Sequence, residues 1–309
     1  MLKVLCRNLF SGDTSMRAMS KDKEKIPVVE RVAELAMKLG QRHLAEYGAT
    51  TSRHDFTQRQ LMSCLILRVY LKTTYRGVLD LLATSAGLRQ RLGLADKLPH
   101  FTTLQKFSGR SQVLAIAQKL VGQIGAVAAG QRPGQTEMAM DATGLARTTV
   151  SDYFCSRRGR KFRRWVKVAV VVVAGSLLPA ALAVDLKPTH DCVQARSLLA
   201  QAALVAQPQR LYADAGYDAE WIHEVCRERW GVESVIPAVP RRADGTAGGQ
   251  WRGQMTPEYL QQANYNRRWA VESFFSALKR TMGSALSARR PDQMLAEAAL
   301  KVLAYALRR

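Results

Sequence analysis

Three acidic residues that lie far apart in the sequence have the chemistry of metal ligands. Asp141 ends the alternating segment TEMAMD and Asp214 ends the segment RLYAD, and we predict a strand for each. Catalytic groups collect at the carboxyl ends of strands in open sheets that are flanked by helices. Glu272 lies in the basic segment NYNRRWAVESFFSALKR, which surrounds a third carboxylate with cations.

Carboxylates that converge from three parts of a chain repel one another unless a cation lies between them. All-oxygen ligands favour Mg²⁺. Two such ions about 4 Å apart can activate a water or a 3′-hydroxyl and stabilise the leaving oxygen of a phosphodiester. The three acids therefore predict metal-dependent phosphoryl transfer on DNA, with the neighbouring cations holding the phosphates.

The segment around Glu272 predicts an α-helix with one polar and one apolar stripe. Tyr265, Arg268, Glu272 and Lys279 fall within roughly 60° of one another at about 100° per residue. A neighbouring apolar stripe would bury the helix against a sheet and leave the polar stripe at the rim of the core. A simpler interpretation treats Arg268 and Glu272 as a surface pair one helical turn apart, which contributes about 0.2–0.5 kcal/mol.

Three other acids compete with Asp214 for the second position. Asp218 and Asp191 are better explained as helix N-caps, since a glutamine follows Asp191 by three residues as in a capping box. Asp185 is better explained as a loop residue before a proline. We therefore prefer Asp214, because Gly216 then lets the chain turn sharply into the next helix.

The charge of the chain points to a polyanionic partner. A formal net charge of +21 over 309 residues favours nucleic acid or an anionic membrane surface. The apolar stretch Val166–Val184 is interrupted by Gly175 and Pro179 and is rich in β-branched residues, so it predicts a hairpin of two buried strands rather than a membrane helix. The N-terminus lacks the apolar core of a secretory signal. We expect a cytoplasmic protein that binds double-stranded DNA and no membrane.

The pattern of apolar residues divides the chain into three parts. Residues 1–25 are expected to be a flexible N-terminus, and residues 26–130 have the apolar spacing of an all-α domain. Its segment LPHFTTLQKF suits a helix-turn-helix that reads DNA, although helical hairpins that only pack are commoner. Residues 136–309 predict three strands, a helix, a strand, a helix, a strand and a helix. That order fits an α/β domain with a mixed five-stranded sheet flanked by helices.

The pattern Y-x2-R-x3-E-x6-K, formed by Tyr265, Arg268, Glu272 and Lys279, resembles the signature of bacterial insertion-sequence transposases of the DDE type. ADAGYD resembles their second-acid motif and MDATGL their first. The signature is shared by the insertion-sequence four and five groups. Fewer than sixty residues separate Asp214 from Glu272, which leaves no room for the large β-rich insertion common in the four group, so the five group is the closer fit.

The resemblance is close over residues 136–280 and implies an RNase H-like catalytic core. It implies that Asp141, Asp214 and Glu272 bind two Mg²⁺ or Mn²⁺ ions, and that the tyrosine, arginine and lysine of the signature contact phosphates of the transposon end. The implied activity is cleavage at terminal inverted repeats and joining of the 3′-hydroxyl to target DNA by a homodimer. The alternatives are an RNase H-like nuclease that cuts without joining, and an inactive DNA-binding derivative.

Two further segments have cations that suit DNA contacts. The loop RRADGTAGGQWRGQ could close over DNA with the Trp251 indole stacked on a base, or it could be an ordinary surface loop. The run SRRGRKFRRWVK lies beside the first acid, and each phosphate that it neutralises should steepen the salt dependence of binding; a solvated face is the alternative. Its expected phosphate contacts are Arg157, Arg158, Arg160, Lys161, Arg163 and Arg164.

Overall fold

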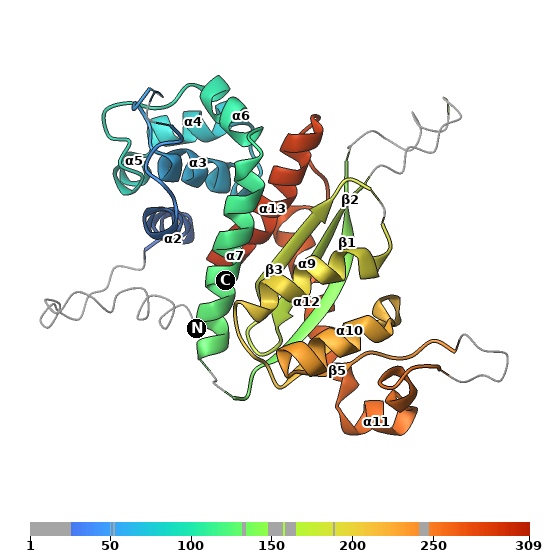
Figure 1. Cartoon of the computed structure of the whole chain (residues 1–309). Coiled ribbons are helices and arrows are strands. Elements are labelled where there is room, and N and C mark those ends of the chain that lie inside the picture. Colours follow the sequence, from blue (N-terminus) through green and yellow to red (C-terminus); the bar gives the residue numbers. More distant parts are fainter. Residues whose placement is uncertain are drawn as a thin grey trace, which may run out of the picture.

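The N-terminal part of the chain folds into helices, as its apolar spacing predicts. The computed structural model describes residues 26–49, 51, 53–131, 134–147, 157, 165–187, 189–240 and 247–309. The helices of this part are α2 (Val28–His43), α3 (Gln58–Tyr70), α4 (Tyr75–Thr84), α5 (Ala86–Arg91), α6 (Phe101–Ser108) and α7 (Gln112–Gly130) (Figure 1). Hydroxyl side chains begin α3, α4 and α5, because Thr57, Thr74 and Ser85 accept hydrogen bonds from backbone N–H groups of the first turn.

Among the described residues, five strands form one mixed sheet. They are β1 (Glu137–Ala146), β2 (Trp165–Val173), β3 (Leu178–Asp185), β4 (Arg210–Ala213) and β5 (Glu233–Val235), in the order β3-β2-β1-β4-β5. β2 is antiparallel to both β1 and β3, whereas β4 is parallel to both β1 and β5. The predicted α/β fold class, a mixed five-stranded sheet flanked by helices and preceded by a helical region, is confirmed.

Helical segments connect the later strands and complete the chain. In sequence order they are α9 (Asp191–Ala203), the 3₁₀ turn η1 (Ala215–Tyr217), α10 (Glu220–Glu224), the π-helical η2 (Val225–Trp230), η3 (Arg252–Gln254), α11 (Pro257–Gln262), η4 (Tyr265–Arg268), α12 (Trp269–Met282) and α13 (Pro291–Arg308). The segment η2 ends at Gly231, whose φ of 71° lies in the left-handed region that glycine adopts without strain.

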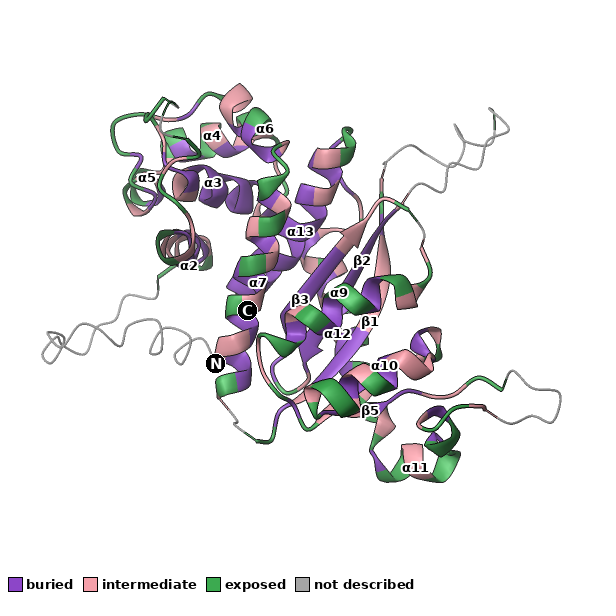
Figure 2. Cartoon of the chain, in the orientation of Figure 1, coloured by how far each residue is buried: buried purple, intermediate pink, exposed green. Residues whose placement is uncertain are grey.

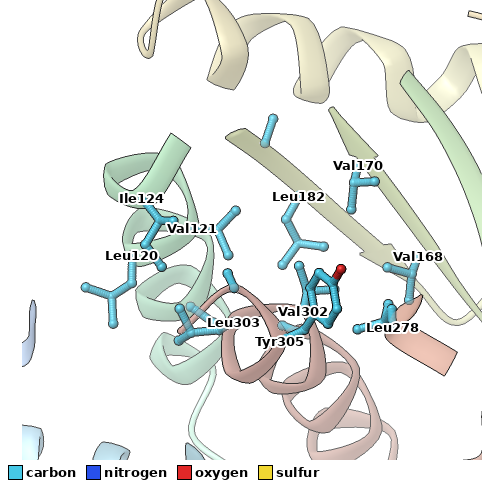
Figure 3. Packing of buried hydrophobic residues seen from close by; sticks show 14 of the residues in the cluster. Leu120, Val121, Ile124, Val168, Val170, Leu182, Leu278, Val302, Leu303 and Tyr305 are labelled. Carbon is cyan, nitrogen blue, oxygen red and sulfur yellow. The ribbon is translucent and has the colours of Figure 1, made fainter. Parts of the chain in front are cut away.

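The apolar stretch Val166–Val184 forms the β2–β3 hairpin, as predicted, and not a membrane helix. Both strands are buried along most of their length (Figure 2), because helices cover both faces of the sheet. On one face, Val168, Val170 and Leu182 lie toward Tyr305 of α13, and α7 packs beside them (Figure 3). The helix α9 packs against β2 and β3 on the other face.

A second apolar segment forms α7. Among the described residues, α7 is the one helix that is long and apolar enough to cross a membrane by length and composition. In the structure it packs against β3 and α13. Gly125 allows a close approach to β3, because a Cβ at this position would lie only 2.4 Å from Ala180 Cα.

The C-terminal helix α13 connects the helical part to the sheet. It packs against α2, α3 and α7, and also against β2, β3 and α12. Arg68 of α3 and Glu297 of α13 form a buried ion pair with Nη2 3.4 Å from Oε2. Glu297 also accepts hydrogen bonds from the N–H groups of Ser287 and Ala288 at 2.8 and 2.9 Å, so this buried charge is both paired and hydrogen-bonded. The helices and the sheet share one hydrophobic core.

Candidate active site

Asp141 and Asp214 lie side by side on neighbouring parallel strands. Met140 of β1 pairs in register with Ala213 of β4, and the two acids are the next residues on each strand. Asp214 comes directly after β4, as predicted. The prediction that the first strand ends at Asp141 is wrong, because the backbone stays paired with β2 as far as Ala146.

The Asp141 carboxylate is largely buried and has other charges nearby. Its side chain is 19% exposed, and Oδ1 accepts a hydrogen bond from Ala142 N at 2.7 Å. Burial is the main reason that the pKa of Asp141 is raised to about 6; the Ala142 N–H and Arg268 lower this pKa, and the carboxylates of Asp214 and Asp191 raise it. Three acids therefore interact here, and a cation between them would relieve their repulsion.

Gly216 leaves the space in which two of these carboxylates converge. Asp214 Oδ1 accepts a hydrogen bond from Gly216 N at 2.9 Å, at the start of η1. A Cβ on Gly216 would lie 2.9 Å from Asp191 Oδ2 and 3.0 Å from Asp214 Oδ1. Gly216 has no left-handed φ, so the glycine is needed for this space rather than for a sharp turn.

Asp191 is a fourth carboxylate at this edge of the sheet. The prediction that Asp191 is a helix N-cap is wrong, because His190 takes that position and its Nδ1 accepts from Cys192 N at 3.5 Å. Asp191 instead pairs with Lys167 of β2, with Nζ 2.6 Å from Oδ1, and the Lys167 side chain is only 5% exposed. A buried ammonium group therefore fixes the Asp191 carboxylate beside Asp214.

Glu272 reaches the same region but is paired with Arg268. Its side chain is 55% exposed, and Oε1 accepts a hydrogen bond from Arg268 Nη2. Arg268 Nη1 lies 3.7 Å from Asp141 Oδ2, so the guanidinium group lies between Asp141 and Glu272. Within the part of the chain that the structure describes, no three His, Cys, Asp or Glu side chains are close enough together to hold a metal ion. The structure thus brings two of the three predicted acids together and keeps the third on Arg268.

Tyr265 lies near the acids, and Lys279 lies further along α12. Tyr265 belongs to the 3₁₀ turn η4, which precedes α12, so the prediction of one continuous α-helix from Tyr265 to Lys279 is wrong. Asn264, which precedes η4, has a left-handed backbone with a φ of 56°. The pKa of Tyr265 is raised mainly by burial; Arg268 lowers it, and Asp214 and Asp141 raise it. Lys279 is half-buried two helical turns beyond the glutamate.

Asp218 and Arg252 form a buried pair that sequence reasoning missed. The prediction that Asp218 is an N-cap is wrong, because α10 begins at Glu220 with Ala219 as its N-cap. Arg252 Nε donates to Asp218 Oδ1 at 2.5 Å, and Nη2 donates to Oδ2 at 2.7 Å. The Asp218 side chain has no exposed surface and that of Arg252 is 10% exposed. The only sequence signal is an arginine beside Trp251 in a glycine-rich loop.

This pair positions Trp251 against η2. The Arg227 guanidinium lies 4.8 Å from the centroid of the Trp251 ring, and Trp251 Nε1 donates to Glu228 Oε1 at 3.0 Å. The indole therefore makes internal contacts in this state, and its stacking on a base stays a prediction.

Of the six expected phosphate contacts in the basic run beside the first acid, the structure describes one. Arg157 is exposed. The other expected phosphate contacts, Arg158, Arg160, Lys161, Arg163 and Arg164, lie outside the described residues.

Comparison with known proteins supplies the family. The family described as a transposase DDE domain matches residues 132–307, which is more than half of the chain and includes all three predicted acids. The chain belongs to this transposase family. No curated protein matches the chain in sequence.

One solved structure that aligns with this transposase domain is a piggyBac transposase synaptic complex with hairpin DNA. The alignment covers 98% of this chain and 73% of that chain, at 10% sequence identity and a TM-score of 0.43. A similarity of this size carries no argument about function.

DDE transposases generally use divalent metal ions, and the residues of this chain fit such an ion in kind. Asp141 and Asp214 are adjacent oxygen donors, and the raised pKa of Asp141 reflects in part the repulsion from its neighbouring carboxylates. To bind the ion, Glu272 would have to give up its ion pair with Arg268. Asp141 and Asp214 could therefore hold a cation together, whereas Glu272 is paired to an arginine.

Proposed function

We propose that this protein is a transposase that cleaves DNA at transposon ends and joins the freed 3′-hydroxyl to target DNA. Asp141, Asp214 and Glu272 are the proposed metal ligands and catalytic residues. The observation that carries the proposal is the placement of Asp141 and Asp214 side by side, on the central parallel strands of a DDE transposase domain. The short distance in sequence from Asp214 to Glu272 supports a member of the insertion-sequence five group.

When bound, two Mg²⁺ or Mn²⁺ ions would supply an activated nucleophile and stabilise the leaving oxygen of the phosphodiester. Asp141 and Asp214 would bind and orient the ions, and Glu272 would complete the set by leaving Arg268. Released from its two carboxylates, the Arg268 guanidinium has the planar geometry that binds a phosphate through two hydrogen bonds.

Double-stranded DNA is the proposed partner, as terminal inverted repeats and as target. The net charge of +21 supports it. Tyr265 and Lys279 flank the acids on η4 and α12 and are proposed to contact phosphates with Arg268. The basic run that begins near Arg157 and the loop that contains Trp251 are proposed to extend this contact, and a homodimer would join two ends.

The test is a cleavage and strand-transfer assay with labelled DNA that contains the inverted repeats flanking the gene. Asp141→Asn, Asp214→Asn and Glu272→Gln should each lower both reactions at least about a hundredfold, because each removes a charged ligand of ions that stabilise the transition state by several kcal/mol. The control is Asp80→Asn, which neutralises an exposed acid on α4 and should change neither reaction. Full activity of Asp141→Asn would refute the metal-site assignment. Cleavage without joining by the unaltered protein would indicate a nuclease instead.

A further inference from the structure

Tyr217 has a buried hydroxyl with no partner next to the proposed cation site. It is the last residue of η1, three residues after Asp214, and it has no exposed surface. Among the described residues, its hydroxyl oxygen is one of the buried side-chain atoms without a hydrogen bond. An unpaired buried hydroxyl destabilises a fold, and this one is three residues from a proposed metal ligand.

The charged groups near this hydroxyl are acceptors. Oxygens of Asp191 and Asp214 converge on Gly216, the residue before Tyr217. The pKa of Tyr217 is raised well above its ordinary value, first by burial and then by the negative charges of Asp191, Asp141 and Asp214. The hydroxyl is therefore close enough to three carboxylates to be affected by their charge, and it donates a hydrogen bond to none of them.

The positions of these carboxylates explain why the hydroxyl has no partner. Asp191 is drawn toward Lys167 by the ion pair at 2.6 Å. Asp214 Oδ1 is bonded to Gly216 N, and Asp141 Oδ1 to Ala142 N. Lys167 and Arg268 offset part of this negative charge, but the carboxylates of Asp214 and Asp191 still raise the pKa of Asp141 by repulsion, and a cation bound by these acids would draw them together.

We propose that Tyr217 is a positioning residue of the cation site, whose hydroxyl donates a hydrogen bond to the carboxylate of Asp214 or Asp191 once a divalent ion has drawn these side chains together. The proposal rests on the proposed function. A carboxylate that accepts such a bond has its remaining lone pairs fixed toward the ion, and loss of such an outer partner typically weakens metal binding about 10–100-fold. If Tyr217 served only as core packing, removal of its hydroxyl would not change the affinity of the site for metal.

The experiment compares Tyr217→Phe with the unaltered full chain in two measurements. Urea unfolding without metal should give equal or greater stability for Tyr217→Phe, because the variant removes an unpaired buried hydroxyl and keeps the ring. Calorimetric titration with Mn²⁺ alone should give a dissociation constant about 10–100-fold higher for Tyr217→Phe.

Tyr305→Phe is a matched control. The Tyr305 hydroxyl is also buried without a hydrogen bond, but its ring packs edge-on against Phe274, in the core between α12 and α13. Its removal should leave Mn²⁺ affinity unchanged.

The outcomes separate this inference from the proposed function. Equal Mn²⁺ affinity for Tyr217→Phe and the unaltered protein, together with weaker binding by Asp141→Asn, would overturn the role of Tyr217 and leave the cation site standing. Equal affinity for Asp141→Asn and the unaltered protein would overturn both. A loss of affinity in Tyr305→Phe as large as that in Tyr217→Phe would also overturn the role of Tyr217.

Discussion

Arg268 and Glu272 form an ion pair one helical turn apart, and the same guanidinium group lies 3.7 Å from Asp141. A positive charge of the chain itself therefore lies between two of the proposed metal ligands. A metal ion bound by Asp141 and Glu272 would lie close to the Arg268 guanidinium, and the two positive charges would repel each other. Metal binding therefore competes with the Arg268–Glu272 ion pair. The Arg268–Glu272 pair, which the helix pattern alone would predict to be a simple surface contact, is thus expected to weaken metal binding at the site.

Removal of the Arg268 charge should strengthen metal binding. We expect Arg268→Gln to bind Mn²⁺ about two- to fivefold more tightly, because a partly exposed ion pair such as Arg268–Glu272 contributes about 0.2–1 kcal/mol. We also expect it to bind DNA more weakly. Calorimetric titration with Mn²⁺ measures the first effect and filter binding the second. The control is Arg267→Gln, which removes the neighbouring charge of η4, paired with Glu137 at 3.5 Å. Mn²⁺ binding by Arg268→Gln that is no tighter than by Arg267→Gln would contradict the competition.

The Asp218–Arg252 pair should contribute strongly to stability. Asp218→Asn leaves the buried Arg252 guanidinium without the carboxylate that forms two hydrogen bonds with it, and we expect a loss of about 3–5 kcal/mol in the free energy of unfolding. Urea denaturation followed by circular dichroism measures it. Asp292→Asn is the control, because it neutralises an exposed pair with Arg290 and should change stability by less than about 0.5 kcal/mol. Similar small losses in the two variants would show that the buried pair does not anchor the segment around Trp251.

The local pattern of apolar and β-branched residues is sufficient to predict the strands of the sheet, but not where every strand ends. The β2–β3 hairpin follows from a β-branched run with a turn at Gly175, because both strands are buried and lie next to each other in the chain. The end of β1 was predicted at Asp141, since apolar alternation stops there. The strand continues to Ala146 because its partner is Trp165–Ala169 of β2, and such pairing between distant segments leaves no trace in the alternation of β1 alone.

For the candidate site too, the sequence predicts some residues and misses the roles of others. Asp214 could be predicted because it follows a short strand directly. Asp191 and Asp218 resemble caps in the sequence, yet their partners are Lys167 and Arg252, which lie 24 and 34 residues away. A partner at that separation is set by tertiary packing, so no spacing rule can indicate it. The role of Arg268 between two acids depends likewise on where η4 meets β1.

His223 should make stability depend on pH. It is wholly buried, with Nδ1 2.8 Å from Ser234 Oγ, and burial, with a contribution from Arg227, lowers its pKa to about 4. The unfolded chain therefore takes up this proton first as pH falls below about 6.5, and the stability present at pH 7 is progressively lost toward pH 4. Between pH 7 and 5 we expect a loss of about 2 kcal/mol from this residue.

The measurement is urea unfolding of the unaltered protein and His223→Gln at several pH values. The raised pKa of Asp141 acts in the opposite direction, so the difference between the two proteins at each pH is the relevant quantity. That difference should shrink as pH falls from 7 to 5. A difference that stays constant would mean that His223 takes up its proton at the same pH in the folded protein as in the unfolded chain.

Two glycines of α7 should respond oppositely to the same substitution. Alanine is favoured over glycine in a helix interior by up to about 1 kcal/mol. At Gly122 the new Cβ would lie 3.7 Å from Val205 Cγ2 and 3.9 Å from Ala180 O, which are ordinary contacts. At Gly125 it would lie 2.4 Å from Ala180 Cα and 2.7 Å from Ala180 Cβ, so β3 would have to move.

We therefore expect Gly122→Ala to raise the free energy of unfolding by about 0.5–1 kcal/mol and Gly125→Ala to lower it by about 1–3 kcal/mol. Urea denaturation of both variants measures the difference. Ala180→Gly combined with Gly125→Ala should restore only part of the loss, because the backbone contact with Ala180 Cα remains. Stabilisation by both single substitutions would mean that α7 does not cross β3 at Gly125, and that the contact between the helical part and the sheet is looser than the structure has it.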